Sequence, residues 1–67
     1  MRIDRVKLAT EMARREMRYI QLAKLAGISR ITMSGINGGK AIHPDTANKI
    51  AQALNIPLEE IIEKALV

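Results

Sequence analysis

The chain has 67 residues, which is enough for one domain. It contains no cysteine, phenylalanine or tryptophan and a single tyrosine, so disulfides and thiolate metal sites are excluded and the core must be aliphatic. Eleven Lys and Arg residues against seven Asp and Glu residues give a net charge of +4, which favours an anionic partner such as nucleic acid or an acidic membrane surface.

No apolar run approaches the roughly 20 residues that are needed to cross a bilayer. The opening stretch, MRIDRVK, lacks the apolar segment of a signal peptide. We therefore expect a cytoplasmic protein with no membrane partner, made of a single domain over residues 1–67.

A first helix is predicted over residues 3–16, because apolar residues recur there at helical spacing and neither proline nor glycine interrupts them. Asp4 in its first turn and Arg14 and Arg15 in its last turn suit the helix macrodipole. We expect one stripe of this helix to face the core. The residues of that stripe are Ile3, Val6, Ala9 and Ala13, widened by Leu8 and Met12.

Two short amphipathic helices are predicted next, over residues 19–26 and 30–37. Between them, Gly27 offers the positive φ that ends a helix, and Ser29 offers a hydroxyl that caps the next one. A helix, a tight turn with glycine and a capped second helix form the pattern of a helix-turn-helix. This pattern predicts a small DNA-binding domain whose reading helix lies within residues 29–38.

A helical wheel separates two faces of the helix over residues 30–37. The inward residues are Met33 and Ile36, and the outward residues are Ile31, Ser34, Gly35 and Gly38, with Arg30 on the flank. In the major groove, Arg30 can donate two hydrogen bonds to guanine, Ile31 can pack on a thymine methyl group, and Ser34 can bond base edges or phosphate. Glycine inside a helix costs about 1 kcal/mol relative to alanine, so Gly35 indicates either close approach to DNA or a tolerated defect.

The third helix is expected to stop at Asn37, Gly38 and Gly39, because Asn and Gly tolerate the left-handed conformation. Pro44 favours the start of a fourth helix that runs to about Leu54. We expect Asn55 to be its left-handed stop. The residues expected on its buried face are Ala47, Ile50, Ala51 and Leu54.

A fifth helix is predicted from Pro57, with acidic residues in its first turn. The residues expected on its apolar side are Leu58, Ile61, Ile62, Ala65 and Leu66. No segment shows the alternation of a strand. The expected fold is therefore an all-α, compact five-helix bundle that contains a helix-turn-helix.

Groups around the third helix are expected to bind DNA phosphates. Arg18 and Tyr19 stand at the start of the second helix, whose free N–H groups favour an anion. Lys40 follows the third helix and can reach the opposite flank, and Thr46 and Asn48 near the start of the fourth helix are weaker candidates. The wheel position of Tyr19 also fits a ring in the core with only its hydroxyl outside.

This stretch resembles the helix-turn-helix of the phage Cro and repressor family, also called XRE-type regulators. The residues that carry the resemblance are Tyr19, Leu22, Ala23, Gly27, Ile28, Met33 and Ile36. The stretch HPDTANKIAQALNIPLEEII is also similar to the fourth and fifth helices of that family. The resemblance therefore covers nearly the whole chain, from about Leu8 onward.

The resemblance implies a five-helix domain that binds operator DNA, usually as a dimer, and usually controls transcription. The base contacts that it implies come from the positions of Arg30, Ile31, Ser34 and Gly35, and the phosphate contacts from those of Arg18, Tyr19 and Lys40. Many relatives carry Glu at the position of Asn37, often paired with an Arg in the first helix. Because Met12 stands near that place here, we expect no such ion pair.

Other signals in the sequence are weaker. The stretch from Gly35 to Lys40 is one residue short of a phosphate-binding loop and follows no strand. His43 is the only histidine and has no cysteine partners, so no metal site is expected. The few carboxylates assemble no catalytic set. We therefore expect a protein that is not an enzyme and that holds no metal or cofactor.

The main interpretation is a sequence-specific transcriptional regulator, a repressor, that binds double-stranded DNA as a homodimer in the cytoplasm, associated with the nucleoid. The candidate dimer residues are those at 55–58, Leu66 and Val67, because apolar ends often seek partners. Two alternatives stay open. One is an antitoxin or mobile-element accessory protein with the same fold and a protein partner, and the other is a protein-interaction module whose basic face is incidental.

Overall fold

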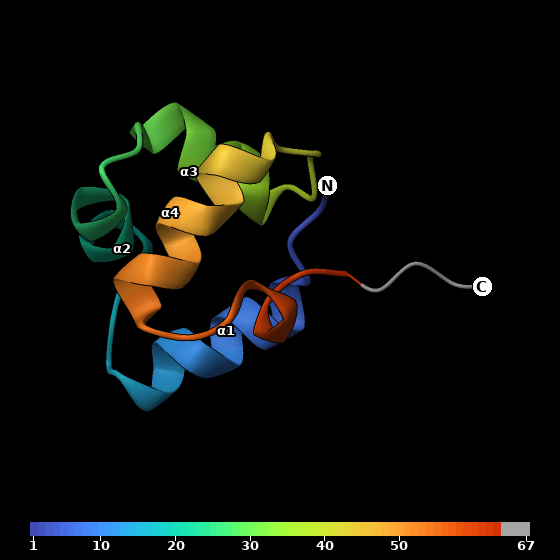
Figure 1. Cartoon of the computed structure of the whole chain (residues 1–67). Coiled ribbons are helices and arrows are strands. Elements are labelled where there is room, and N and C mark those ends of the chain that lie inside the picture. Colours follow the sequence, from blue (N-terminus) through green and yellow to red (C-terminus); the bar gives the residue numbers. More distant parts are fainter. Residues whose placement is uncertain (64–67) are drawn as a thin grey trace.

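The computed structural model describes residues 1–63, which form four α-helices and one short 3-10 turn around an aliphatic core (Figure 1). The helices are α1 (Arg5–Arg14), α2 (Tyr19–Ala26), α3 (Arg30–Asn37) and α4 (Pro44–Leu54). The helix α4 crosses the middle of the molecule and packs against α2, which in turn packs against α3. The all-α fold is confirmed.

The helices α2, α3 and α4 have the predicted bounds, and α3 and α4 have the predicted buried faces. Their buried residues are Leu22, Ala23 and Ala26 in α2, Met33 and Ile36 in α3, and Ala47, Ile50, Ala51 and Leu54 in α4. These residues recur at intervals of three and four along each helix, so each helix presents one apolar stripe to the core. The polar residues between them remain toward the solvent.

All four helices end in the same backbone motif. Shortly after each helix, one residue adopts a left-handed conformation, and the N–H of the next residue donates to a carbonyl in the last turn of the helix. The left-handed residues and their φ angles are Glu16 (50°), Gly27 (72°), Gly39 (84°) and Asn55 (56°). The hydrogen bonds are Met17 N to Met12 O, Ile28 N to Ala23 O, Lys40 N to Gly35 O and Ile56 N to Ala51 O, at 2.9–3.1 Å. The predicted stops at Gly27 and Asn55 are confirmed, and within the third stop it is Gly39 that takes the left-handed conformation.

The helix α1 is shorter than the predicted segment of residues 3–16. It begins at Arg5 because the Asp4 carboxylate caps it and accepts hydrogen bonds from the N–H groups of Val6 at 3.0 Å and Lys7 at 3.1 Å. At the other end, the left-handed conformation of Glu16 turns the chain away from the helix axis. Asp4 was predicted to lie in the first turn, but it is the N-cap residue directly before that turn.

The buried face predicted for α1 was partly wrong. Leu8 and Met12 are buried at 1% and 4% exposure and form its inner face, whereas Val6 is 76% exposed. The two other predicted inward residues that are exposed are Ala9 and Ala13. Ile3 is buried, but it reaches the core from the extended segment before α1 and does not set the phase of the helix. Within the helix itself, Leu8 and Met12 bury more apolar area than the alanines can, so the stripe that contains Leu8 and Met12 faces the core.

In place of the predicted fifth helix, the described residues form a single 3-10 turn, Leu58–Glu60, followed by an extended segment. This segment pairs antiparallel with the extended residues before α1, through a bridge between Ile3 and Ile62. The hydrogen bonds of the pairing are Asp4 N to Ile61 O at 2.7 Å and Glu63 N to Arg2 O at 2.9 Å. Backbone groups that form hydrogen bonds with the N-terminal segment are not available for the hydrogen bonds of an α-helix. This is why the predicted fifth helix does not continue beyond the 3-10 turn. The predicted apolar positions Ala65 and Leu66 lie outside the described residues.

Arg15 joins α1 to the end of α4. Its Nη2 donates a hydrogen bond to the backbone oxygen of Leu54 at 2.7 Å, and its Nη1 pairs with the Glu11 carboxylate at 3.1 Å. Carbonyls in the last turn of a helix lack a helical partner and carry partial negative charge. Arg15 therefore stabilises the packing of α1 against the end of α4.

Candidate nucleic-acid interface

The turn between α2 and α3 depends on Gly27 and Ser29. Gly27 has φ 72° and ψ 34°, and a Cβ there would meet no atom within 4 Å, so it is the backbone conformation and not a lack of space that favours glycine. The Ser29 hydroxyl oxygen accepts from the N–H of Thr32 at 3.0 Å and lies 2.8 Å from its Oγ1. These contacts end α2 and start α3 within a few residues, as the helix-turn-helix pattern predicts.

The helix α3 has one face in the core and one in solvent. Met33 and Ile36 are buried at 3% and 1% exposure, whereas Ile31 is 86% exposed. Arg30 and Ser34 are also exposed, and Gly35 is half-buried. The predicted orientation of α3 is therefore confirmed, and the contact of its outer residues with DNA bases stays a prediction.

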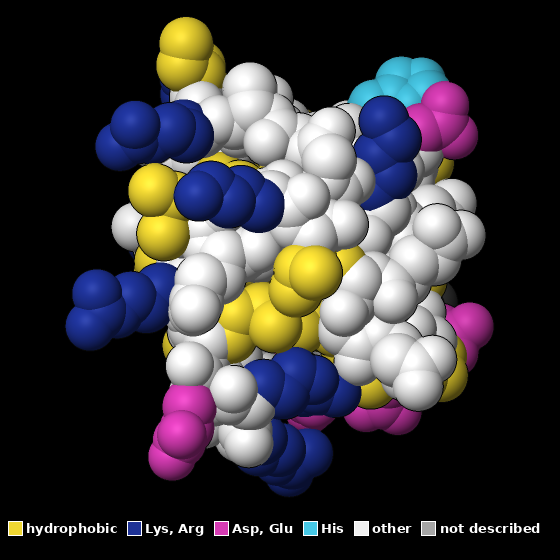
Figure 2. All heavy atoms as spheres, turned by 90° about the vertical axis from the view of Figure 1, so that its left-hand side faces the viewer, with side chains coloured by type: hydrophobic (Ala, Val, Ile, Leu, Met, Phe, Trp, Pro, Cys, Tyr) yellow, Lys and Arg dark blue, Asp and Glu magenta, His cyan; other side chains and the backbone are white. Residues whose placement is uncertain are grey.

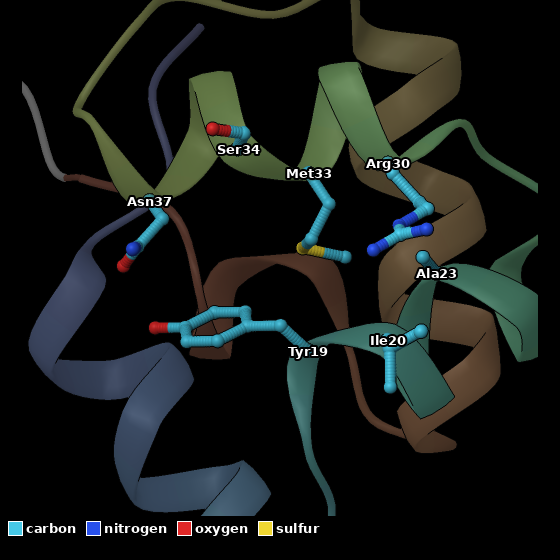
Figure 3. A pocket seen from close by; sticks show the side chains of 7 residues that line it. All are labelled: Tyr19, Ile20, Ala23, Arg30, Met33, Ser34 and Asn37. Carbon is cyan, nitrogen blue, oxygen red and sulfur yellow. The ribbon is translucent and has the colours of Figure 1, made fainter.

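A groove of about 260 Å³ runs between α2 and α3 (Figure 3). Met33 lies at its floor, and the Arg30 side chain extends from α3 toward Ala23 of α2. The Tyr19 ring lies across the other end of the groove, below Asn37. Tyr19 is half-buried and packs against the core, which agrees with the predicted position of its ring.

A second hollow lies between the outer face of α3 and the start of α4. Lys40 borders it and lies over Gly35, so that a Cβ added to Gly35 would meet the Cδ of Lys40 at 3.5 Å. This contact belongs to the end motif of α3, in which the residue after the left-handed one packs on the last turn. The hollow brings together two predicted groups, Lys40 and Thr46, and also the outward residue Ile31.

The other predicted phosphate-binding residues are less closely grouped. Arg18 is exposed at the N-terminal cap of α2, and its backbone N–H donates to the Gln21 side chain at 2.8 Å. Asn48 is exposed on α4, two residues beyond Thr46. Residues two apart on a helix do not share a face, so the structure does not place Asn48 beside Thr46.

Two residues of this surface were missed at the level of the sequence. Asn37 lines the groove of Figure 3, and its backbone oxygen accepts a hydrogen bond of 3.4 Å from Arg5, which links α1 to the end of α3. It is seven residues beyond Arg30 and three beyond Ser34, so helical spacing alone would have placed it on their side. His43 caps α4, because its Nδ1 accepts from the N–H of Asp45 at 3.2 Å.

The basic side chains of the predicted DNA-binding surface are available to bind an anion. Figure 2 shows Lys and Arg side chains around an apolar hollow, with acidic side chains toward the edges of the view. Within residues 1–63, the ion pairs that Lys and Arg side chains form join Arg14 and Arg15 to Glu11. In that part of the chain no carboxylate therefore neutralises the predicted contact residues Arg18, Arg30 and Lys40.

Neither a metal site nor a membrane span is found in the part of the chain that the structure describes. No group of three His, Asp or Glu side chains comes together as metal ligands in residues 1–63. No helix of the same residues is long and apolar enough to cross a membrane.

Comparison with solved structures finds this fold inside larger chains. A mutant of hydroxyethylphosphonate dioxygenase is 31% identical with a TM-score of 0.84, and the match covers 100% of this chain and 15% of that one. Native PhpD with cadmium is 30% identical with a TM-score of 0.83 over 100% of this chain and 15% of its own. This chain thus spans about 15% of the length of the structures that it matches. No match among curated proteins reaches significance.

The family comparison agrees with the geometry. The model of the Cro/C1-type HTH DNA-binding domain matches residues 7–64, which include all four helices except the first two residues of α1. The glycine turn, the cap of α3 and the two opposed faces of α3 lie within the matched range. The chain belongs to the family of Cro/C1-type helix-turn-helix DNA-binding domains.

Proposed function

We propose that this chain is a sequence-specific transcriptional regulator, a repressor without enzymatic activity, that binds double-stranded DNA with α3 in the major groove. The observation that supports this most is the contrast between the two faces of α3. Met33 and Ile36 are buried at 3% and 1% exposure and hold the helix to the core, whereas Ile31 is 86% exposed. A helix that is held from behind and presents bonding groups outward can enter the groove of B-DNA.

The outer residues of α3 differ in what they can recognise. The Arg30 guanidinium can donate two hydrogen bonds to O6 and N7 of guanine, and the Ser34 hydroxyl can bond a base edge or a phosphate. Gly35 allows the duplex to approach the helix backbone. The exposed cations Arg18 and Lys40 stand on either side of α3 in the chain and would bind phosphates, because neither is neutralised within residues 1–63.

Repressors of this kind act as dimers on palindromic sites, and we propose a homodimer that binds half-sites about 34 Å apart. The segment at 55–58 is a candidate interface, since Ile56 and Leu58 are only half-buried within the monomer. The other candidate dimer residues, Leu66 and Val67, lie outside the described residues. Sedimentation that shows only monomer at high concentration would count against the dimer.

Selection of bound duplexes from a random pool tests the function directly. We expect one enriched motif, palindromic if the protein is a dimer. The affinity for that motif should fall linearly on a log–log plot as salt rises, because bound phosphates release counterions. A pool without enrichment, together with affinities that are indifferent to salt, would contradict the proposal.

A second candidate function is supported by the matched solved structures. This fold occurs within chains named hydroxyethylphosphonate dioxygenase, at 31% identity, and within PhpD, at 30% identity, so the domain can be part of a protein that is not a regulator. In that case, the basic face would bind another protein segment. The same selection decides between the two, since a protein-interaction module would enrich no duplex.

A third candidate keeps DNA binding and adds a protein partner, as in an antitoxin or a mobile-element accessory factor. The fold and the predicted contacts with DNA would be the same. A specific protein that co-purifies with the chain and alters its affinity for the selected duplex would favour this role over that of a free-standing repressor.

A further inference from the structure

The hollow between α3 and the start of α4 has a mixed chemical character. Its volume is about 310 Å³, which leaves room for the edge of a base. One part of its lining is apolar and is formed by Ile31, Ala41 and Ile42. Another part carries polar side chains, which are those of Thr32, Lys40, His43 and Thr46. Ile31 belongs to the face of α3 that points away from the core, and Ala41 and Ile42 belong to the segment that joins α3 to α4.

The floor of this hollow is the backbone at Gly35, where no side chain projects into the space. Ile31 is four residues before Gly35, so the two positions are neighbours on one face of the helix. On the other side, the aliphatic stem of Lys40 lies 3.5–3.9 Å from the point that a Cβ of Gly35 would occupy. Any side chain at residue 35 would therefore stand between Ile31 and Lys40 and fill the space.

We infer that this hollow receives the 5-methyl group of a thymine, with Ile31 as its apolar wall and Gly35 as its floor. The inference rests on the proposed function and names one base that the domain reads. Among the four bases, only thymine presents a methyl group in the major groove. The hollow also has a charge that suits this partner, because Lys40 is one of its lining residues and its ammonium group can bind a phosphate of the duplex.

The test removes the methyl group and nothing else. Each thymine of the duplex obtained by selection is replaced in turn by deoxyuridine, which leaves the base pair intact, and the affinity of each duplex is measured. We expect one thymine per half-site at which deoxyuridine weakens binding about fourfold. That factor corresponds to the ~0.8 kcal/mol of burying one methyl-sized group.

Two variants assign the methyl effect to the hollow. In Ile31→Ala the apolar wall is lost, and in Gly35→Ala the floor is occupied, so the thymine and deoxyuridine duplexes should bind equally well to each variant. The alanine at residue 35 fits the fold, because its Cβ meets the Lys40 stem at an ordinary contact distance of 3.5 Å. Gly38→Ala is the matched control, since the same change outside the hollow, at φ −81°, should keep the fourfold ratio.

The possible results separate this inference from the proposed function. If no duplex is enriched, both are overturned. If a duplex is enriched and bound but no thymine shows a methyl effect, the inference alone is overturned. It is likewise overturned if the methyl effect persists unchanged in both Ile31→Ala and Gly35→Ala.

Discussion

The end of α1 allows a sharp test of the backbone description. Glu16 has φ 50°, and it is the charged member of the four left-handed residues that end the helices. A side chain with a Cβ costs about 1–2 kcal/mol in this conformation. Replacing it by glycine removes that strain, but the greater freedom of glycine in the unfolded chain costs about 0.5–1 kcal/mol. We expect this relief of strain to stabilise the fold by about 0.5–1 kcal/mol, and the loss of the negative charge in Glu16→Gly adds to it.

The control for this variant is Glu16→Ala, which removes the same charge and keeps the Cβ. It also measures the unfavourable effect of a carboxylate near the C-terminal end of a helix, which is about 0.3–1 kcal/mol. In thermal unfolding, Glu16→Gly should melt roughly 2–8 °C above Glu16→Ala, given the size of the domain. If the glycine variant melts at or below the alanine variant, the left-handed conformation of this residue is not a source of strain.

Three further predictions concern arginine and lysine residues. Arg30→Ala should weaken binding of the selected duplex by about 1–3 kcal/mol and relax the preference at one base pair, and an unchanged footprint and base preference would refute its role. Lys40→Ala should weaken binding to all duplexes alike and lower the salt slope by about one, and a loss confined to one sequence would refute phosphate binding. Arg15→Ala should destabilise the fold by about 1–2 kcal/mol in urea, since a charged hydrogen bond of 2.7 Å to Leu54 is lost. Arg14→Ala removes only an exposed ion pair and should change stability by less than about 0.5 kcal/mol, so equal effects of the two arginine variants would contradict the assigned contact.

The middle of the chain was predictable because its signals are local. The bounds of α2, α3 and α4, and the buried positions of Met33 and Ile36, follow from apolar spacing, from Ser29 and from the stops at Gly27 and Asn55. A cap or a left-handed residue acts on hydrogen bonds within one helical turn. Such contacts are present whatever the rest of the fold does, so the outward face of α3 follows from the order of its residues alone.

The two ends of the chain were not predictable in this way. In α1, one possible stripe contains alanines and one valine, which bury less apolar area than Leu8 and Met12 in the other stripe. Which stripe faces the core depends on the surface that the other helices present to α1. The segment after Pro57 carries helix-forming residues, yet its backbone pairs with residues 2–4. Local propensity is a weak preference that distant backbone partners can override.

The candidate site shows the same division. Helical periodicity was enough to place Arg30, Ile31 and Ser34 on one outward face of α3, because three and four residues make one turn. Tertiary structure decided what surrounds that face: the stem of Lys40 over Gly35, the groove closed by Tyr19, and the hollow shared with α4. These features join segments that meet only when the chain reverses between helices, and no spacing within a single helix encodes them.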